Sequence, residues 1–289
     1  MKRQTRDKAI HGIIKILQCL IPKLPLPITE KIGVLLGLIV FHTAKKGRNR
    51  AIKQIKAVLK LSEKDATKVA RDNFVHLGKS VVEFLYFPKL NKRLLDRLIP
   101  NVQGKEHLDR AVAMGKGVII LTGHIGNWEL GAAWLSLNGY KLNVVAASQG
   151  DEFVDQTIFS YREKTGTKVI PKNRSLKGIV KALQRKELLG MLIDQDAKTN
   201  GVIVDFLGLP ASTPTGITSL GRKFECPIVP LFTIRQKDNT FKLEILPPVF
   251  AGEDEQTLAM LNDILSRYIL KYPEQWIWFY QRWKSTNSI

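Results

Sequence analysis

The chain has 289 residues, of which 44% are hydrophobic, and a formal net charge of +19. This length and apolar content predict one large α/β domain with an appended helical segment. The charge narrows the partners to nucleic acid, an anionic membrane surface, or acidic proteins and substrates. Only Cys19 and Cys226 are present, which argues against a disulfide framework or a zinc site and favours a reducing cytoplasm.

The positive charge is concentrated at the N-terminus, where residues 1–60 contain 14 Lys and Arg against two acidic residues, a net +12. Apolar residues recur at helical spacing over residues 8–21, which predicts an amphipathic helix that ends at Pro22. Further helices are expected at three places before the core: 29–43, 48–59 and 62–87.

These first helices favour contact with a membrane, because apolar faces flanked by Lys and Arg suit an interfacial anchor. The alternative is a helical layer folded onto the core. The basic start is not expected to be a signal peptide, since polar residues interrupt the apolar run 10–21 and no small-x-small cleavage site follows. The charge-free run 32–41 is shorter than the about 20 residues that a membrane span needs.

From about residue 104 the pattern changes to alternating strands and helices. Strands are expected at 117–122, 142–147, 167–170, 188–193, 202–206, 227–234 and 241–246. Helices are expected near 105–114, 127–137, 151–165, 175–185, 214–224 and 254–271. This alternation predicts an α/β fold with a mixed, largely parallel sheet flanked by helices. We therefore divide the chain into a membrane-associated segment, 1–45, and a domain, 46–289, with a helical lead-in at 46–103 and an α/β core at 104–289.

The segment 123–130, Gly-His-Ile-Gly-Asn-Trp-Glu-Leu, carries the strongest chemical signal. It joins a predicted buried strand to a helix, a junction where ligands bind in open α/β sheets. His124 and Glu129 would point about 140° apart on one regular helix. They can therefore meet only if His124 precedes the helix, in a turn that Gly123 and Gly126 allow. A carboxylate bonded to one imidazole nitrogen leaves the other free to act as a general base on an alcohol. A purely structural His beside a Glu is the alternative.

With Asn127 and Trp128 before the Glu, this His-x-x-x-x-Glu motif resembles the late acyltransferases of lipid A biosynthesis, a branch of the lysophospholipid acyltransferase superfamily. The resemblance implies that His124 deprotonates an acceptor hydroxyl and that Glu129 holds the imidazole. Asn127 and Trp128 are then expected to contact the substrate. Acyl transfer from a thioester needs no metal, so neither a metal nor a cofactor is expected.

Further blocks extend the resemblance in the same order as in the family. They lie at 161–170, 191–196, 202–216 and 272–283. In the first of them, Arg162 is the position that the family would use to help bind a lipid head group or the developing charge. The alternative for Arg162 is a solvated position on a helix.

The second of these blocks ends a predicted strand with Asp194, Gln195 and Asp196, which the resemblance places at the substrate. Two carboxylates at this spacing would suit magnesium in isolation. We prefer a positioning role because no third ligand is evident. Arg222, on the helix before the predicted strand 227–234, could bind phosphate or solvent equally well.

Together the blocks imply an acyltransferase at the cytoplasmic face of the inner membrane. It would move a fatty acyl chain from acyl-carrier protein or acyl-CoA to a hydroxyl of a lipid A precursor. The basic surface suits a phosphorylated acceptor, an acidic carrier and anionic lipid. Another glycolipid or a lysophospholipid is the alternative acceptor. A nucleic-acid-binding protein is the alternative of a different class, but no helix-turn-helix, RNP or zinc motif supports it, and we expect no nucleic-acid partner.

Overall fold

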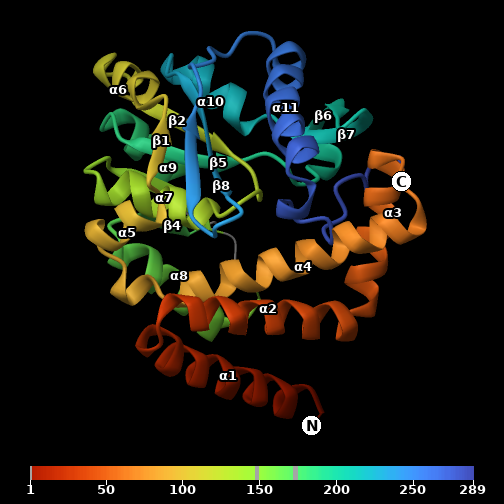
Figure 1. Ribbon diagram of the computed structural model, residues 1–289. Helices are drawn as coiled ribbons and strands as arrows, with labels where there is room; N and C mark the ends of the chain where they lie inside the picture. Colours follow the sequence, from red (N-terminus) through yellow and green to blue (C-terminus); the bar gives the residue numbers. More distant parts are fainter. Residues whose placement is uncertain (1, 147–149, 172–174) are drawn as a thin grey trace.

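The computed structural model describes residues 2–146, 150–171 and 175–289, with the backbone alone for residues 2–10. Within these ranges a seven-stranded sheet forms the centre (Figure 1), in the order β1-β9-β8-β2-β5-β3-β4. The strands of this sheet are β1 (Asn101–Gln103), β2 (Val118–Thr122), β3 (Leu142–Ala146), β4 (Lys168–Pro171), β5 (Leu188–Leu192), β8 (Ile228–Arg235) and β9 (Phe241–Ile245). The strands from β8 to β4 in this order are parallel, whereas β9 runs antiparallel to β8 and carries β1 at the edge. The predicted mixed, largely parallel sheet is confirmed.

The central strands are continuous apolar runs because helices cover both faces of the sheet. Every residue of β2 and of β8 is buried. Along β2, Val118 and Ile120 belong to one hydrophobic cluster, and Ile119 and Leu121 belong to the other. This alternation is the two-residue period of a strand with one apolar core on each side.

The helices of the core follow the predicted alternation. They are α5 (Lys92–Leu98), α6 (Lys105–Ala113), α7 (Trp128–Leu137), α8 (Glu152–Lys164), α9 (Ser175–Gln184), α10 (Gly216–Phe224) and α11 (Asp254–Lys271). Residues of α5, α6 and α7 share one cluster with the sheet, and residues of α10 and α11 share the other. All except α5 were predicted, and the predicted ends agree to within about two residues. Residue 147, in the predicted strand 142–147, lies outside the described residues.

One predicted strand lies outside the main sheet. β6 (Gly201–Phe206) pairs only with β7 (Leu209–Pro214), as an antiparallel hairpin. The strand β7, Leu-Pro-Ala-Ser-Thr-Pro, was not predicted, and its Pro, Ser and Thr residues also favour turns. It forms an edge strand, where proline is tolerated.

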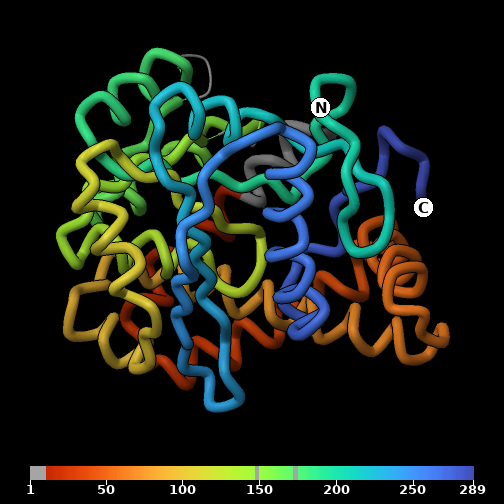
Figure 2. The backbone as a smooth tube through the Cα atoms, turned by 90° about the horizontal axis from the view of Figure 1, so that it is seen from above, coloured from red at the N-terminus to blue at the C-terminus, as the bar shows by residue number. Residues whose placement is uncertain are grey.

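Four helices precede the core: α1 (Lys2–Leu20), α2 (Leu26–Thr43), α3 (Lys45–Leu59) and α4 (Glu63–Leu85). In Figure 1, α4 runs beneath the core, α2 lies below α4, and α1 is outermost. Figure 2 shows the same chain from above, and in both views α3 lies beside the C-terminus. These four helices therefore form layers under the α/β core.

The contact between α2 and α4 depends on glycine. A Cβ atom on Gly37 would lie 2.4 Å from the Phe74 carbonyl oxygen, and one on Gly78 would lie 2.2 Å from the Gly33 carbonyl oxygen. The two helix backbones can approach this closely only because these positions carry no side chain.

Among the described residues, α2 is the one helix long and apolar enough to cross a membrane by length and composition. The prediction that no segment is long enough considered only the charge-free run 32–41. The helix is longer, at 18 residues, because it continues through Glu30 and Lys31. Its glycine face packs on α4, but only 22% of the helix is buried.

Candidate active site

The turn between β2 and α7 has the geometry that the sequence required. His124 lies before α7, which begins at Trp128. Gly126 has a positive φ of 62°, and a Cβ atom there would lie 2.0 Å from the Thr233 carbonyl oxygen. The Gly126 N–H donates to the Gln275 carbonyl at 3.0 Å, and the Asn127 N–H donates to that of Thr233 at 2.9 Å. These bonds hold the turn against β8 and against the short segment that ends at Gln275.

The partner of the His124 ring is Asp194. Nδ1 of His124 lies 2.9 Å from Oδ1 of Asp194, and the His124 backbone N–H donates to Oδ2 at 2.7 Å. The Trp276 indole N–H also donates to Oδ2, at 2.8 Å. Asp194 follows β5, which pairs in parallel with β2, so both side chains lie at the carboxyl edge of the sheet. A positioning role was predicted for Asp194, but its contact with His124 was not.

These contacts define the protonation of the pair. Complete burial would raise the pKa of Asp194, but the charge of His124 and the hydrogen bonds from His124 and Trp276 outweigh burial and lower it. An ionised carboxylate only accepts hydrogen bonds, so Nδ1 of His124 is the donor. In the neutral form of the ring, Nε2 is then the nitrogen without a proton. Among the described residues Nε2 has no hydrogen-bond partner, and the His124 side chain is 22% exposed. His124 can therefore accept a proton from a bound hydroxyl.

The prediction that Glu129 holds His124 does not agree with this geometry. Glu129 accepts two hydrogen bonds from Arg162, 2.9 Å from Nε and 2.6 Å from Nη2, and one from the Trp128 indole at 3.1 Å. Glu129 lies in the first turn of α7, from which its side chain reaches α8 rather than the turn before the helix. The solvated alternative for Arg162 is wrong, because its side chain is only 19% exposed.

Asn127 and Trp128 lie beside His124, in different roles. The Asn127 side-chain oxygen accepts from the Leu130 N–H at 3.1 Å and so caps α7. Its Nδ2 donates to Glu83 at 2.7 Å, so both ends of the amide have protein partners. Asn127 was predicted to bind substrate, but these bonds make it part of the scaffold. The Trp128 ring packs edge-on against His124, with centroids 5.1 Å apart, and remains available to a substrate.

The structure separates the other predicted site residues. Gln195 is exposed, and Asp196 accepts a hydrogen bond from the Ser285 hydroxyl at 2.6 Å. Arg222 is wrongly assigned to the site. It lies in the last turn of α10, before the amino end of β8, and pairs with Asp254 at 2.7 Å. His124 follows the carboxyl end of β2, which is parallel to β8, so the two residues lie at opposite edges of the sheet. Within the described ranges, no group of three His, Cys, Asp or Glu side chains could hold a metal ion.

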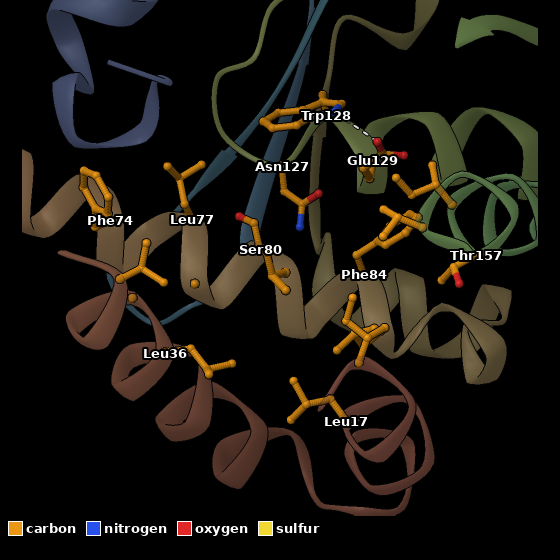
Figure 3. A pocket seen from close by; sticks show the side chains of 18 of the residues that line it. Leu17, Leu36, Phe74, Leu77, Ser80, Phe84, Asn127, Trp128, Glu129 and Thr157 are labelled. Carbon is orange, nitrogen blue, oxygen red and sulfur yellow. Dashed lines mark hydrogen bonds between the residues drawn. The ribbon is translucent and has the colours of Figure 1, made fainter. Parts of the chain in front are cut away.

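An apolar pocket of about 610 Å³ lies between the N-terminal helices and the start of α7 (Figure 3). Trp128 and Glu129 border one side of it, and Leu17 of α1 and Leu36 of α2 lie across from them. Apart from Ser80, Asn127, Glu129 and Thr157, the lining side chains are apolar or aromatic, and Gly37 and Gly78 complete the wall. A pocket of this composition suits a hydrocarbon chain.

A buried polar group beneath the turn was missed. It consists of Glu83 and His76 on α4 and Arg235 at the end of β8, all at most 8% exposed. These residues are far apart in the sequence and form no motif. The available signal was a charge at the end of the apolar strand 228–235 and another within the apolar run Val-Val-Glu-Phe-Leu that ends α4.

Comparison with known proteins gives consistent matches. A model of the family described as bacterial lipid A biosynthesis acyltransferase matches residues 4–285. The lipid A biosynthesis lauroyltransferase of Escherichia coli (strain K12) is 25% identical over 279 residues, which is 92% of this chain and 88% of the relative. The lipid A biosynthesis palmitoleoyltransferase of the same strain is 24% identical, over 91% and 87% of the two chains. The phosphatidylinositol mannoside acyltransferase of Mycobacterium tuberculosis (strain ATCC 25618 / H37Rv) is 25% identical, over 73% and 69%.

Proposed function

The chain belongs to the bacterial lipid A biosynthesis acyltransferase family and is an acyltransferase, and from that premise we propose its substrates and mechanism. A fatty acyl chain moves from a thioester of acyl-carrier protein or coenzyme A to a hydroxyl of a lipid A precursor. One observation carries the chemistry: the buried Asp194 orients His124 beside an apolar pocket. No cofactor takes part in the proposed reaction.

His124 is the proposed general base. Its Nε2 accepts the proton of the acceptor hydroxyl as the hydroxyl oxygen attacks the thioester carbonyl carbon. The carbon–sulfur bond then breaks, and the leaving thiolate takes the proton back from His124. The Asp194 carboxylate stabilises the imidazolium that exists between these steps, as the acidic member of a hydrolase triad does. General-base help of this kind contributes about 10²–10⁴-fold in rate.

The oxyanion that forms on the carbonyl needs donors that are not already engaged. Arg162 was a candidate, but its Nε and Nη2 are bonded to Glu129. The first N–H groups of a helix have no partner within the helix. The Asn127 side chain accepts a hydrogen bond from the Leu130 N–H. The N–H groups of Trp128 and Glu129 are therefore the proposed donors to the oxyanion. We assign Arg162 and Glu129 to shaping the wall of the pocket.

The pocket is proposed to hold the acyl chain of the donor. Its walls are almost entirely apolar, and it reaches Trp128, whose ring contacts His124. Each methylene group moved from water into such walls contributes about 0.8 kcal/mol. The depth of the pocket beneath Trp128 would therefore determine the preferred chain length.

The acceptor is proposed from the relatives. Two enzymes of Escherichia coli that match about nine tenths of this chain are named for lipid A biosynthesis. A second candidate acceptor is another glycolipid, since a relative of similar identity is named a phosphatidylinositol mannoside acyltransferase. The nucleic-acid alternative is set aside because the chain is an acyltransferase.

The first helices are proposed to lie at the cytoplasmic face of the inner membrane. Ile13 and Ile16 on α1 and Leu35 on α2 are each more than half exposed. These outward apolar side chains lie in a segment with a net charge of +12 over residues 1–60. Apolar area together with cations is what binds a helix to anionic lipid.

The experiment that tests the function reads the mass of the product. Purified protein is incubated with acyl-carrier and coenzyme A thioesters of several chain lengths, together with a lipid A precursor or a mannosylated phosphatidylinositol. We expect the lipid A precursor to gain one acyl group, and the folded His124→Ala protein to add it at least 100-fold more slowly. Acylation of the mannoside alone would assign the second candidate. No acylated product with either acceptor would refute both.

A further inference from the structure

We infer that the buried Glu83–Arg235–His76 group is a positioning device that holds the His124 turn in its reactive geometry. The inference concerns residues that do not touch the substrate, and it rests on the proposed role of His124. It is carried by a continuous chain of hydrogen bonds from α4 and β8 to the turn.

The group reaches the turn at two points. Arg235 binds both carboxylate oxygens of Glu83, at 2.5 and 2.8 Å, and Glu83 accepts from Asn127 Nδ2 at 2.7 Å. His76 Nε2 lies 3.0 Å from the Gly126 carbonyl oxygen, and His76 Nδ1 lies 3.3 Å from Arg235 Nε. Asn127 and Gly126 are three and two residues from His124, so the Glu83–Arg235 pair and His76 both act on the turn itself.

These contacts also define the state of His76. Since Arg235 can only donate, Nδ1 of His76 accepts, and Nε2 carries the proton that it donates to Gly126. Burial and the charge of Arg235 lower the pKa of His76 to about 3, so the ring stays neutral. The Gly126 carbonyl is therefore held by a His76 ring that stays neutral near neutral pH.

Stability does not explain why this position carries charges. Glu83 and Arg235 are both only 7% exposed in their side chains. Replacing such a pair by apolar residues of similar volume is often neutral or stabilising, because desolvation offsets the attraction. An apolar pair could not accept the directional hydrogen bond that Asn127 donates to Glu83. The carboxylate fixes the Asn127 amide, which also caps α7, and so sets where the helix begins relative to His124.

The discriminating variant removes both charges together. In Glu83→Leu/Arg235→Met no charge is left unpaired, so we expect only a modest loss of melting temperature, from the partners that Asn127 Nδ2 and His76 Nδ1 lose. If the group positions the turn, kcat falls about 10–100-fold with both KM values unchanged, since misplacement by about 1 Å can cost that much. Amide hydrogen exchange of the peptide 123–130 should also become faster, while exchange in the central strands stays the same.

A second variant covers the case in which the double variant does not fold. Asn127→Ser keeps a good N-cap for α7 but removes the donor to Glu83. The Glu83–Arg235 pair stays intact, and we expect a smaller kcat loss, of about 3–10-fold, with faster local exchange. The matched control is Lys242→Met/Glu244→Leu, a partly buried pair on β9 with side chains 22% and 17% exposed. It should leave kcat and the exchange of 123–130 unchanged.

Three results would overturn the inference: wild-type kcat and exchange in either folded test variant, a rise in exchange spread over the whole protein, or an equal kcat loss in the control. The exchange measurement needs no substrate. If the wild type turned over none of the tested acceptors, the proposed function would fail while exchange of 123–130 still decided the role of this group.

Discussion

The His124 turn and the apolar pocket lie side by side but are held by different kinds of contact. The turn is held by directional bonds from distant elements: Asp194 after β5, Thr233 on β8, and Gln275 near the C-terminus. The pocket is bounded by apolar side chains of several helices. α1, its outermost wall, bonds to α8 through two polar side-chain pairs, His11–Asp151 and Gln18–Thr157.

The difference follows from what each region has to do. Proton transfer requires a base within hydrogen-bond distance of one proton, so His124 needs fixed geometry. A hydrocarbon chain has no directional partner, and it needs only volume and exclusion of water. Changes at the turn should therefore alter rate at constant specificity, and changes in the pocket should alter specificity at nearly constant rate for the best substrate.

The largest effect is expected from the variants that test which carboxylate is the hydrogen-bond partner of His124. Asp194→Asn places an amide against Nδ1 and favours the wrong tautomer, so we expect kcat to fall about 10²–10⁴-fold, as in His124→Ala. Glu129→Gln keeps an oxygen for Arg162 and should cost much less. Both variants are measured by single-turnover acyl transfer after circular dichroism confirms folding. A larger loss in Glu129→Gln than in Asp194→Asn would restore Glu129 as the partner of His124.

The next largest effect is expected on stability, from the Arg162–Glu129 pair between the turn and the pocket. Arg162→Ala leaves the Glu129 carboxylate, 15% exposed, without its main partner. We expect the free energy of unfolding in urea to fall by about 3 kcal/mol. The control is Arg222→Ala, which breaks a more exposed pair and should change the free energy of unfolding much less. Equal, small effects in the two variants would show that the Arg162 pair is not structural.

A pH experiment tests whether the buried His76 stays neutral in the folded protein. The pKa of His76 is lowered from 6.5 to about 3 by burial and by the charge of Arg235. Between these values the unfolded chain binds a proton that the folded protein does not, so stability falls as the pH drops below 6.5, by about 1.4 kcal/mol per unit. Urea unfolding at pH 7 and pH 5 should therefore show a loss about 2 kcal/mol larger in the wild type than in His76→Gln. Equal losses in both proteins would contradict the buried, neutral His76.

The smallest effect is a change of chain length. Leu36→Trp enlarges a side chain that lines the pocket. It should shift the preferred donor to a shorter acyl chain, with kcat/KM for longer donors falling about fourfold for each methylene excluded, the equivalent of 0.8 kcal/mol. Leu35→Trp, one residue along on the outer face of the same helix, is the matched control. A donor series gives the answer, and the same shift in both variants would place the acyl chain elsewhere.

Local sequence patterns were sufficient to predict much of the fold and the position of His124, the proposed general base. The apolar runs of β2 and β8 predicted buried strands, because strands covered on both faces need apolar residues throughout. The strand–turn–helix pattern with Gly123 and Gly126 placed His124 before α7, because the glycines allow an irregular turn there. The hairpin strand β7 was missed, since its Pro, Ser and Thr residues also favour turns.

The tertiary structure alone decided how the site residues are paired. The sequence by itself determined that His124 has carboxylates available, through the short-range rules of strand, glycine turn and helix. It could not determine that Asp194 rather than Glu129 is the partner, nor that Glu83 and Arg235 hold the turn. Those contacts depend on which strands are neighbours and how α4 packs beneath them, and packing between elements leaves no periodic trace in a single sequence. Arg222 and Asp194 both carried a charge near a strand end, and the parallel pairing of β8, β2 and β5 places them at opposite edges of the sheet.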